Sequence, residues 1–225
     1  MFGSIRIFIA FVFLSGRVFS QSYAPEPGEV GSTAIHMDSN VIVSWATHCE
    51  VNRGPLDIQD PSAGMASFGS PDSAIGPAKG DGFNVVSLGD RGEAIFHFHP
   101  PIKNEPGPDF ALFENVFQDN YMELGFVEVS TNGIDYFRFP SYSEAPTDVQ
   151  QGNASFSDCR YVRNLAGKYR REYGTPFDLS DLDSLTELNL EHIAFVRIVD
   201  VVGILDSVNG SFDSQGRLIN DPYPT

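Results

Sequence analysis

The stretch 124–139, LGFVEVSTNGIDYFRF, holds the clearest strand and turn signals in the chain. Asn132-Gly133 at its centre is a residue pair that tight hairpin turns favour, because both positions tolerate positive φ. Residues 135–139 then alternate between two faces with the period of a β-strand. Before the turn, Phe126-Val127 place apolar groups on both faces, which is typical of a strand covered on both sides. The stretch therefore predicts an antiparallel hairpin whose first strand lies centrally in a sheet.

Similar short patterns recur along the chain and are separated by turn residues such as Gly89-Asp90. The expected strands are Val41–Ala46, Asn84–Leu88, Glu93–His99, Phe110–Val116, Leu124–Ser130, Asp135–Phe139 and Ile193–Val201. Helical signals are confined to 160–169 and 180–190. With no helix–strand alternation, we expect one all-β antiparallel sandwich over 34–225, with long loops and one or two short helices. An extended leader is expected at 21–33.

The N-terminus has the layout of a secretory signal peptide. Arg6 precedes an apolar run, Ile7–Leu14, and small residues around Ser20 allow cleavage before Gln21. An apolar run of this length falls well short of the ~20 residues that a membrane span requires. No Cys lies near the cleavage point for lipid attachment. We therefore expect a secreted or cell-surface protein without a membrane span.

The chain is strongly acidic, with 30 Asp and Glu against 14 Lys and Arg and a net charge of −16. Such a surface repels nucleic acid and anionic lipid, so neither is an expected partner. It attracts divalent cations wherever carboxylates converge. Cys49 and Cys159 are the two cysteines. In an oxidising compartment they are expected to form one long-range disulfide, with two buried free thiols as the alternative.

Several motifs carry a family resemblance. They are 86–89 (VSLG), 107–115 (GPDFALFEN), 126–133 (FVEVSTNG), 164–168 (NLAGK), 173–179 (YGTPFDL), 196–203 (VRIVDVVG) and 221–225 (DPYPT). In this order they resemble a family of bacterial exported cell-surface proteins, which often carry C-terminal sorting signals of the PEP-CTERM or type IX secretion kind. The hairpin motif is also similar to galactose-binding-like jelly rolls such as discoidin domains.

The resemblance implies location and fold more than activity. It implies a jelly-roll form of the sandwich, exported to the cell surface. In that family a further strand rich in Gly, Phe, Asp and Leu follows the last motif. The resemblance therefore implies that this chain is a C-terminally truncated copy without its final strand.

The loop near the C-terminus has the composition of a calcium site. Asp206, Asp213, Gln215 and Asp221 supply oxygen ligands, and Gly216 allows a sharp bend. Calcium takes 6–8 oxygen ligands, which loops of this kind can provide, although the bidentate Glu of an EF-hand is missing. The alternative is a surface loop of Asx-turns, in which Asp and Asn bind their own backbone. Calcium is thus the candidate cofactor, in a structural role.

Glu114 and Asn115 form the most distinctive polar element beside a predicted strand. Glu114 shares a face with Phe110 and Leu112, so it is expected to be partly buried. A buried carboxylate needs a partner, and Arg197 on a central strand is the expected one. A structural ion pair is favoured over a catalytic role.

His97 and His99 form a His-x-His pair on one face of a strand. Two imidazoles at this spacing can share a zinc, iron or copper ion. The other metal ligands of a cupin motif are absent from the positions at which that motif places them. The alternative is two histidines that face solvent without a metal.

Lys168, Tyr169, Arg171 and Tyr173 form a basic and aromatic cluster in an otherwise acidic chain. Rings stack on sugars and cations attract acidic groups, so this cluster is the candidate ligand-binding surface for a glycan. The alternative is that it neutralises nearby carboxylates. No nucleophile motif such as G-x-S-x-G or H-E-x-x-H occurs.

The sequence therefore favours a non-catalytic binding or adhesion module, stabilised by calcium, for a glycan or another envelope component. The alternative is an extracellular hydrolase or metal-dependent enzyme that uses acidic residues or His97 and His99.

Overall fold

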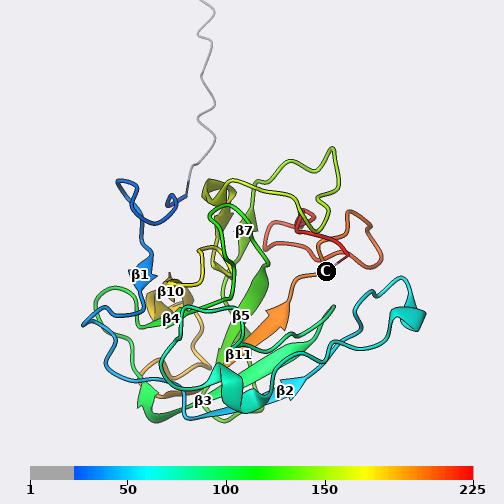
Figure 1. Ribbon diagram of the computed structural model, residues 1–225. Helices are drawn as coiled ribbons and strands as arrows, with labels where there is room; N and C mark the ends of the chain where they lie inside the picture. Colours follow the sequence, from blue (N-terminus) through cyan, green and yellow to red (C-terminus); the bar gives the residue numbers. More distant parts are fainter. Residues whose placement is uncertain (1–22, 225) are drawn as a thin grey trace, which may run out of the picture.

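Antiparallel sheets joined by long loops make up residues 23–224, the part of the chain that this computed structural model describes (Figure 1). The largest sheet has the strand order β2-β3-β11-β5-β6, and β9 also pairs with β5. Its strands are β2 (His48–Asn52), β3 (Glu93–Ile102), β5 (Gly125–Ser130), β6 (Phe137–Arg138), β9 (Leu165–Ala166) and β11 (Ile193–Asp200). The predicted signal peptide lies outside the described residues.

Two smaller sheets complete the β-structure of the described residues. One has the order β1-β10-β4, formed by β1 (Ile35–His36), β10 (Tyr173–Phe177) and β4 (Phe110–Leu112). The other pairs β7 (Tyr142–Ser143) with β8 (Val162–Arg163). Short 3₁₀ turns occur at η1 (Pro61–Ala63), η2 (Pro71–Ala74), η3 (Cys159–Tyr161) and η4 (Leu179–Leu182). The predicted all-β antiparallel sandwich is confirmed.

The main core lies against the inner face of the central strands β5 and β11. Val127, Val129 and Val196 are fully buried there and pack with aromatic rings from the second layer. Phe110 on β4 stacks on Phe177 of β10 with 5.3 Å between ring centroids. Burying one such side chain contributes about 1.5–3 kcal/mol to folding. The interlocked rings therefore hold the small sheet onto the large one.

The predicted hairpin is present as β5 and β6, with Glu128 paired to Arg138. Gly133 in the turn has φ +72°. The Asn132 side-chain oxygen accepts the N–H groups of Ile134 and Asp135 at 2.9 Å. The predicted hairpin is therefore present, but its connection is wider than a tight turn: Gly133 alone of the pair has positive φ, and the second strand is limited to Phe137–Arg138. Every residue of β5 is buried.

Two predicted strands, Val41–Ala46 and Asn84–Leu88, are extended or turn segments outside the sheets. Val43 is 93% exposed, whereas Trp45 packs against Phe113, so this apolar run is only partly buried and pairs with no strand. The first strand of the large sheet begins later, at His48. Both helical signals become single 3₁₀ turns, η3 and η4.

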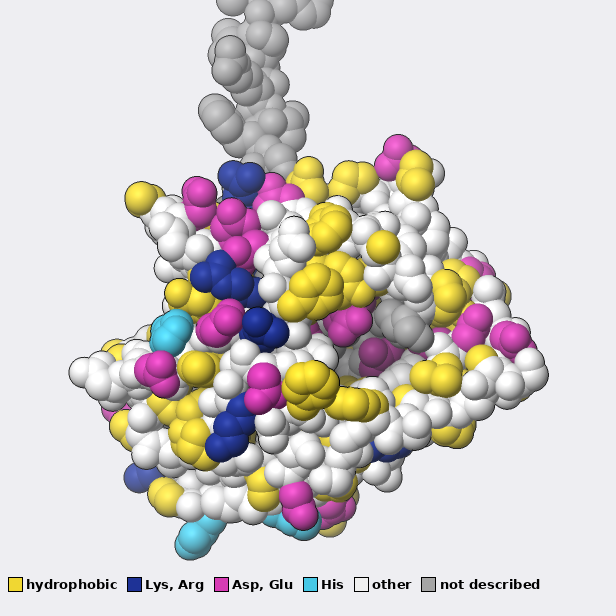
Figure 2. All heavy atoms as spheres, viewed as in Figure 1, with side chains coloured by type: hydrophobic (Ala, Val, Ile, Leu, Met, Phe, Trp, Pro, Cys, Tyr) yellow, Lys and Arg dark blue, Asp and Glu magenta, His cyan; other side chains and the backbone are white. Residues whose placement is uncertain are grey.

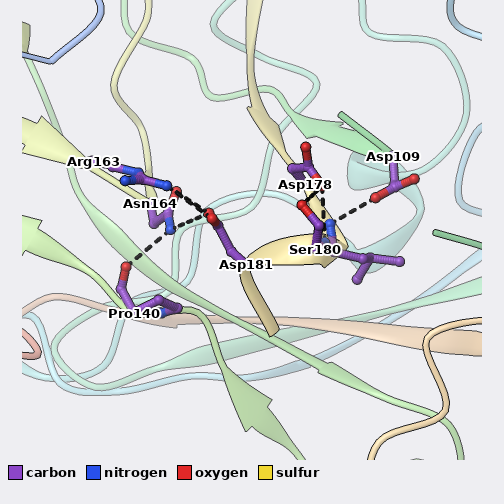
Figure 3. A network of polar contacts seen from close by, with 8 residues as sticks. Asp109, Pro140, Arg163, Asn164, Asp178, Ser180 and Asp181 are labelled. Carbon is purple, nitrogen blue, oxygen red and sulfur yellow. Dashed lines mark hydrogen bonds and ion pairs between the residues drawn. The ribbon is translucent and has the colours of Figure 1, made fainter. Parts of the chain in front are cut away.

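A polar network ties the loop before β4 to η4 (Figure 3). The Asp109 carboxylate accepts the backbone N–H groups of Glu105 and Leu179, both at 2.7 Å. Asp178 caps η4 by accepting the N–H of Ser180 at 2.9 Å.

Asp181 of η4 makes a second set of polar contacts, to residues in and beside β8. It accepts from Arg163 at 2.9 Å and from the Asn164 amide at 2.8 Å, and Asn164 also donates to the Pro140 carbonyl (Figure 3). The polar residues of motifs 107–115, 164–168 and 173–179 therefore hold separate loops together.

Cys49 and Cys159 are both buried and both free, so the disulfide prediction is wrong and the alternative of two free thiols holds. Cys49 lies on the edge strand β2 opposite Phe96, whereas Cys159 packs with Leu165 in a second hydrophobic cluster. Among the described residues, no helix has the length and apolar character needed to cross a membrane.

Candidate functional site

A hollow of about 630 Å³ lies between the large sheet and the segments around β4. One wall is the inner face of β3, with Phe96 and Phe98. The opposite wall includes Phe113 and Trp45, whose ring centroids are 5.4 Å apart. Figure 2 shows a hollow on the viewed face with acidic side chains inside it and hydrophobic side chains around it. A concave space with mostly apolar walls and a few polar groups is the usual form of a ligand site.

Seven carboxylates line this hollow, and four of them lie close enough to influence one another's charge: Glu114, Glu123, Asp200 and Asp221. We call these four residues the acidic end. Asp200 is the last residue of β11 and pairs with Gly125, the first residue of β5. Strand pairing therefore brings Asp200 close to Glu123, which lies just before β5.

Backbone N–H groups provide the hydrogen bonds of three of these carboxylates. Asp221 accepts the N–H of Leu124 at 2.9 Å, and Glu114 accepts the N–H of Val116 at 3.0 Å. The N–H of Arg91 donates to Asp200 at 3.2 Å.

One oxygen of this acidic set is left without a partner. Asp221 is only 3% exposed, and its Oδ1 has no hydrogen-bond partner. Within residues 23–224, no Lys or Arg side chain forms an ion pair with any of the four acids. When these acids are ionised, no ion-paired Lys or Arg among the described residues balances their charge, although Lys79 and Arg171 also line the hollow.

Burial is the main cause of raised pKa values throughout the acidic end. It raises the pKa of Glu114 to about 8, with a further increase from the neighbouring Glu123 charge. It also raises the pKa of Glu123, and it raises the pKa values of Asp200 and Asp221 well above the ordinary aspartate value. Carboxylates in such surroundings hold their protons near neutral pH unless a cation replaces them.

The predicted ion pair between Glu114 and Arg197 is wrong. Arg197 contacts Glu128 through two nitrogens, at 2.5 and 2.6 Å, and the Tyr136 ring covers its guanidinium at 3.9 Å. Glu114 follows β4 and lines the hollow, as does Asn115. Glu114 and Arg197 therefore lie on different sides of the large sheet and cannot form an ion pair.

The predicted calcium loop does not gather its four ligands. Asp206 accepts the N–H of Val208 and the amide of Asn209, which is an Asx-turn. Gln215 is exposed, and Asp221 belongs to the acidic end. The Asx-turn alternative describes this loop better.

Asp213 in the same loop uses both of its carboxylate oxygens in contacts with other residues of the chain. It accepts the backbone N–H groups of Ser143, Gln215 and Arg217 and forms an ion pair with the Arg217 side chain at 2.7 Å. These contacts leave it no role as a calcium ligand.

The basic and aromatic cluster is not one surface. Lys168 is 6% exposed and donates to the Val162 carbonyl at 2.9 Å, and burial lowers its pKa to about 8. Tyr169 is buried and shares a hydrogen bond with Thr33. The predicted glycan surface is therefore wrong for these two residues. Arg171 lines the hollow, and Tyr173 lies on β10.

The structure changes which residues make up the predicted histidine metal site. His97 lies beside His48 and Glu50 of β2, while His99 is exposed and outside this group. Within the described residues, these three are the only His, Cys, Asp or Glu set of three whose ligand atoms all lie within 4.8 Å of one another. His48 and Glu50 were missed because β2 was predicted in the wrong segment.

Glu123 and Asp200 were missed as site residues for a different reason. Each lies at the end of a predicted strand, a position at which carboxylates from neighbouring strands can meet. No family model, curated protein or solved structure matches this chain. The family resemblance in the motifs therefore stays a prediction.

Proposed function

We propose that the chain is an exported, non-catalytic binding module that takes its ligand into the hollow and holds a calcium ion at the acidic end. The observation that carries this proposal is the convergence of four carboxylates with which no Lys or Arg of the described residues forms an ion pair. Asp221 adds a buried oxygen with no partner. Charge of this kind is otherwise costly to bury, and a divalent cation offsets that cost.

Calcium suits this set of ligands better than a transition metal does. All candidate ligands are oxygens, from the four carboxylates and the nearby Asn115, and calcium accepts 6–8 oxygens in flexible geometry. No three of these acids have ligand atoms all within 4.8 Å of one another, so binding must draw the side chains inward. Glu114 and Asp221 lie outside regular strands, which allows such movement.

A glycan is the ligand that we propose for the hollow. Carboxylates accept hydrogen bonds from sugar hydroxyls, and bound calcium can take hydroxyl oxygens as further ligands. The rings of Trp45 and Phe113 supply the apolar surface on which a sugar ring can stack. Export through the N-terminal signal would bring such a module to extracellular glycans.

Calorimetric titration of the purified chain with calcium tests the cation site. We expect one calcium per chain and an affinity reduced by at least about tenfold in Asp221→Asn, because one ligand loses its charge. Asp206→Asn is the matched control, since Asp206 is a partly exposed acid near the C-terminus that does not line the hollow. Equal losses in both variants, or no calcium binding by the parent chain, would overturn the assignment.

A glycan array probed with and without calcium tests the ligand. Binding should require calcium and should weaken in Trp45→Ala. Calcium binding without recognition of any glycan would retain the cation site and overturn the ligand class.

Acid–base hydrolysis is a second candidate, favoured by the raised pKa of Glu114. A protonated Glu114 could donate to the leaving oxygen while another carboxylate of the acidic end removes a proton from the attacking water. Release of reducing ends from a bound glycan, lost in Glu114→Gln, would support this activity. An intact glycan after prolonged incubation would exclude it for that glycan.

A further inference from the structure

A second group of potential metal ligands lies on the outer face of the large sheet, away from the hollow. We propose that His48, Glu50 and His97 form a transition-metal site that binds Zn²⁺ through two imidazoles and one carboxylate. This site is separate from the proposed calcium site and does not depend on it.

Strand register places the three side chains together. His48 on β2 lies directly opposite His97 on β3, and Glu50 follows two residues after His48 on the same face. His97 Nε2 is 3.2 Å from Glu50 Oε1, and His48 Nε2 is 3.7 Å from the same oxygen. A tetrahedral zinc ion separates its nitrogen and oxygen ligands by about 3.3 Å, given bond lengths near 2.0–2.1 Å. The structure therefore holds the ligand atoms close to the spacing that zinc needs.

The surrounding residues hold the two imidazoles in place. The His97 ring packs edge-on against Phe195 at 4.8 Å and against His48 at 4.7 Å, measured between ring centroids. Glu50 has the two histidines as its side-chain ion partners. Arg197, which lies across Ile95 of β3 from Glu50, forms ion pairs with Glu128 and Glu93. Among residues 23–224, no Lys or Arg therefore forms an ion pair with the Glu50 carboxylate.

The site is open to solvent and keeps room for another ligand. His48 and Glu50 are more than half exposed, and His97 is about a third exposed. Three protein ligands leave a fourth tetrahedral position for water or for a group from a bound molecule. Because β2 is the edge strand of its sheet, a molecule approaching this edge can reach that position.

The ligand types determine which metals fit. Imidazole with carboxylate suits Zn²⁺, Ni²⁺ and Cu²⁺, whereas Ca²⁺ and Mg²⁺ prefer oxygen ligands alone. The acidic end in the hollow offers only oxygens. The two proposed sites can therefore be occupied at the same time by different ions.

Zinc titration of the untagged chain in saturating calcium tests the proposal. We expect one zinc ion per chain that calcium does not displace. Affinity should fall by at least about tenfold in His97→Ala, since even the loss of an outer-shell partner of a metal ligand costs about 10–100-fold. His99→Ala is the matched control on the same strand and should bind zinc as the parent does. Unchanged binding in His97→Ala, or an equal loss in His99→Ala, would overturn the site.

Two further measurements keep the test decisive if His97→Ala folds poorly. Glu50→Gln changes an exposed side chain and should weaken zinc binding while leaving the fold intact. Electron paramagnetic resonance of bound Cu²⁺ should show coupling to two imidazole nitrogens, reduced to one in His48→Ala. Copper without nitrogen coupling would contradict the proposal. Zinc binding that survives in Asp221→Asn would separate this site from the acidic end.

Discussion

Buried charges in this molecule have two kinds of surroundings. Glu128 is 5% exposed and lies between Arg197 and Arg138, at 2.5 and 2.8 Å, so its charge is neutralised by the protein. The carboxylates of the acidic end have no such partner. This contrast at the level of single residues is what distinguishes a structural ion pair from the proposed binding site.

Replacing Glu128 by Ala should destabilise the fold strongly. Two arginines would lose their shared carboxylate, and breaking a buried pair costs about 3–5 kcal/mol. The free energy of unfolding, measured by urea denaturation, should therefore fall by about 3 kcal/mol.

Arg160→Ala is the control for this change, because its pair with Asp158 is more exposed. Its effect should stay within about 1 kcal/mol. Similar losses in the two variants would contradict the distinction between paired charges in the core and on the surface.

Partial burial of Glu114 could be predicted from the sequence, but its partner could not. Alternation with Phe110 and Leu112 indicated an inward-facing side chain. The choice of Arg197 as its partner failed because it depends on which strands neighbour each other. In the structure Arg197 faces Glu128 across the β11–β5 pair.

At the scale of elements, turns and short strands are fixed by a few local residues. The β5–β6 hairpin follows from Asn132 and Gly133, whose contacts are local in sequence. By contrast, Val41–Ala46 has the composition of a strand but remains outside the sheets, because no neighbouring strand pairs with it. Local patterns therefore predicted turns better than they predicted which apolar runs pair.

Gly167 provides a test of how β9 is placed against the segment before β5. It has φ +80°, and an added Cβ would lie 1.8 Å from the Glu123 carbonyl oxygen. Gly167→Ala should therefore lower the melting temperature sharply, with a loss above about 3 kcal/mol from the steric clash and the strained backbone.

Gly216→Ala is the matched control for that change. Gly216 also has positive φ, at +76°, but an added Cβ meets nothing within 4 Å. Its loss should be limited to about 1 kcal/mol of backbone strain. If both variants melt at the same temperature, the close approach of Gly167 to Glu123 is not important for stability.

At the scale of the whole molecule, the acidic end should make stability fall as pH rises. The raised pKa values mean that the folded chain, without metal, binds more protons than the unfolded chain between the ordinary carboxylate pKa and about pH 8. The free energy of unfolding therefore decreases across that window, by up to about 1.4 kcal/mol per pH unit for each such group.

Urea denaturation in a chelator at several pH values between about 5 and 8 measures this slope. Asp221→Asn should flatten it, and saturating calcium should reverse it because calcium binds the deprotonated acids. A metal-free stability that rises with pH over this window would contradict the account.

The sequence predicted the all-β sandwich because strand periodicity and turn residues are local signals. The hollow could not be predicted, since its acidic end joins residues 114–123 to residues 200–221, two parts of the chain that are distant in sequence. Asp221 was predicted beside Asp206 and Asp213, but in the structure it lies in the hollow with Glu114, Glu123 and Asp200. Proximity to Asp206 and Asp213 along the chain was a poorer guide than the pairing of β11 with β5.

A crystal structure of the chain grown in calcium, with the anomalous signal of the ion recorded, tests the central claim most directly. We predict one peak bounded by Glu114, Glu123, Asp200 and Asp221, with the side chains drawn closer together, and its loss in Asp221→Asn. A hollow without a peak, or a peak at the loop of Asp206 and Asp213, would contradict the claim.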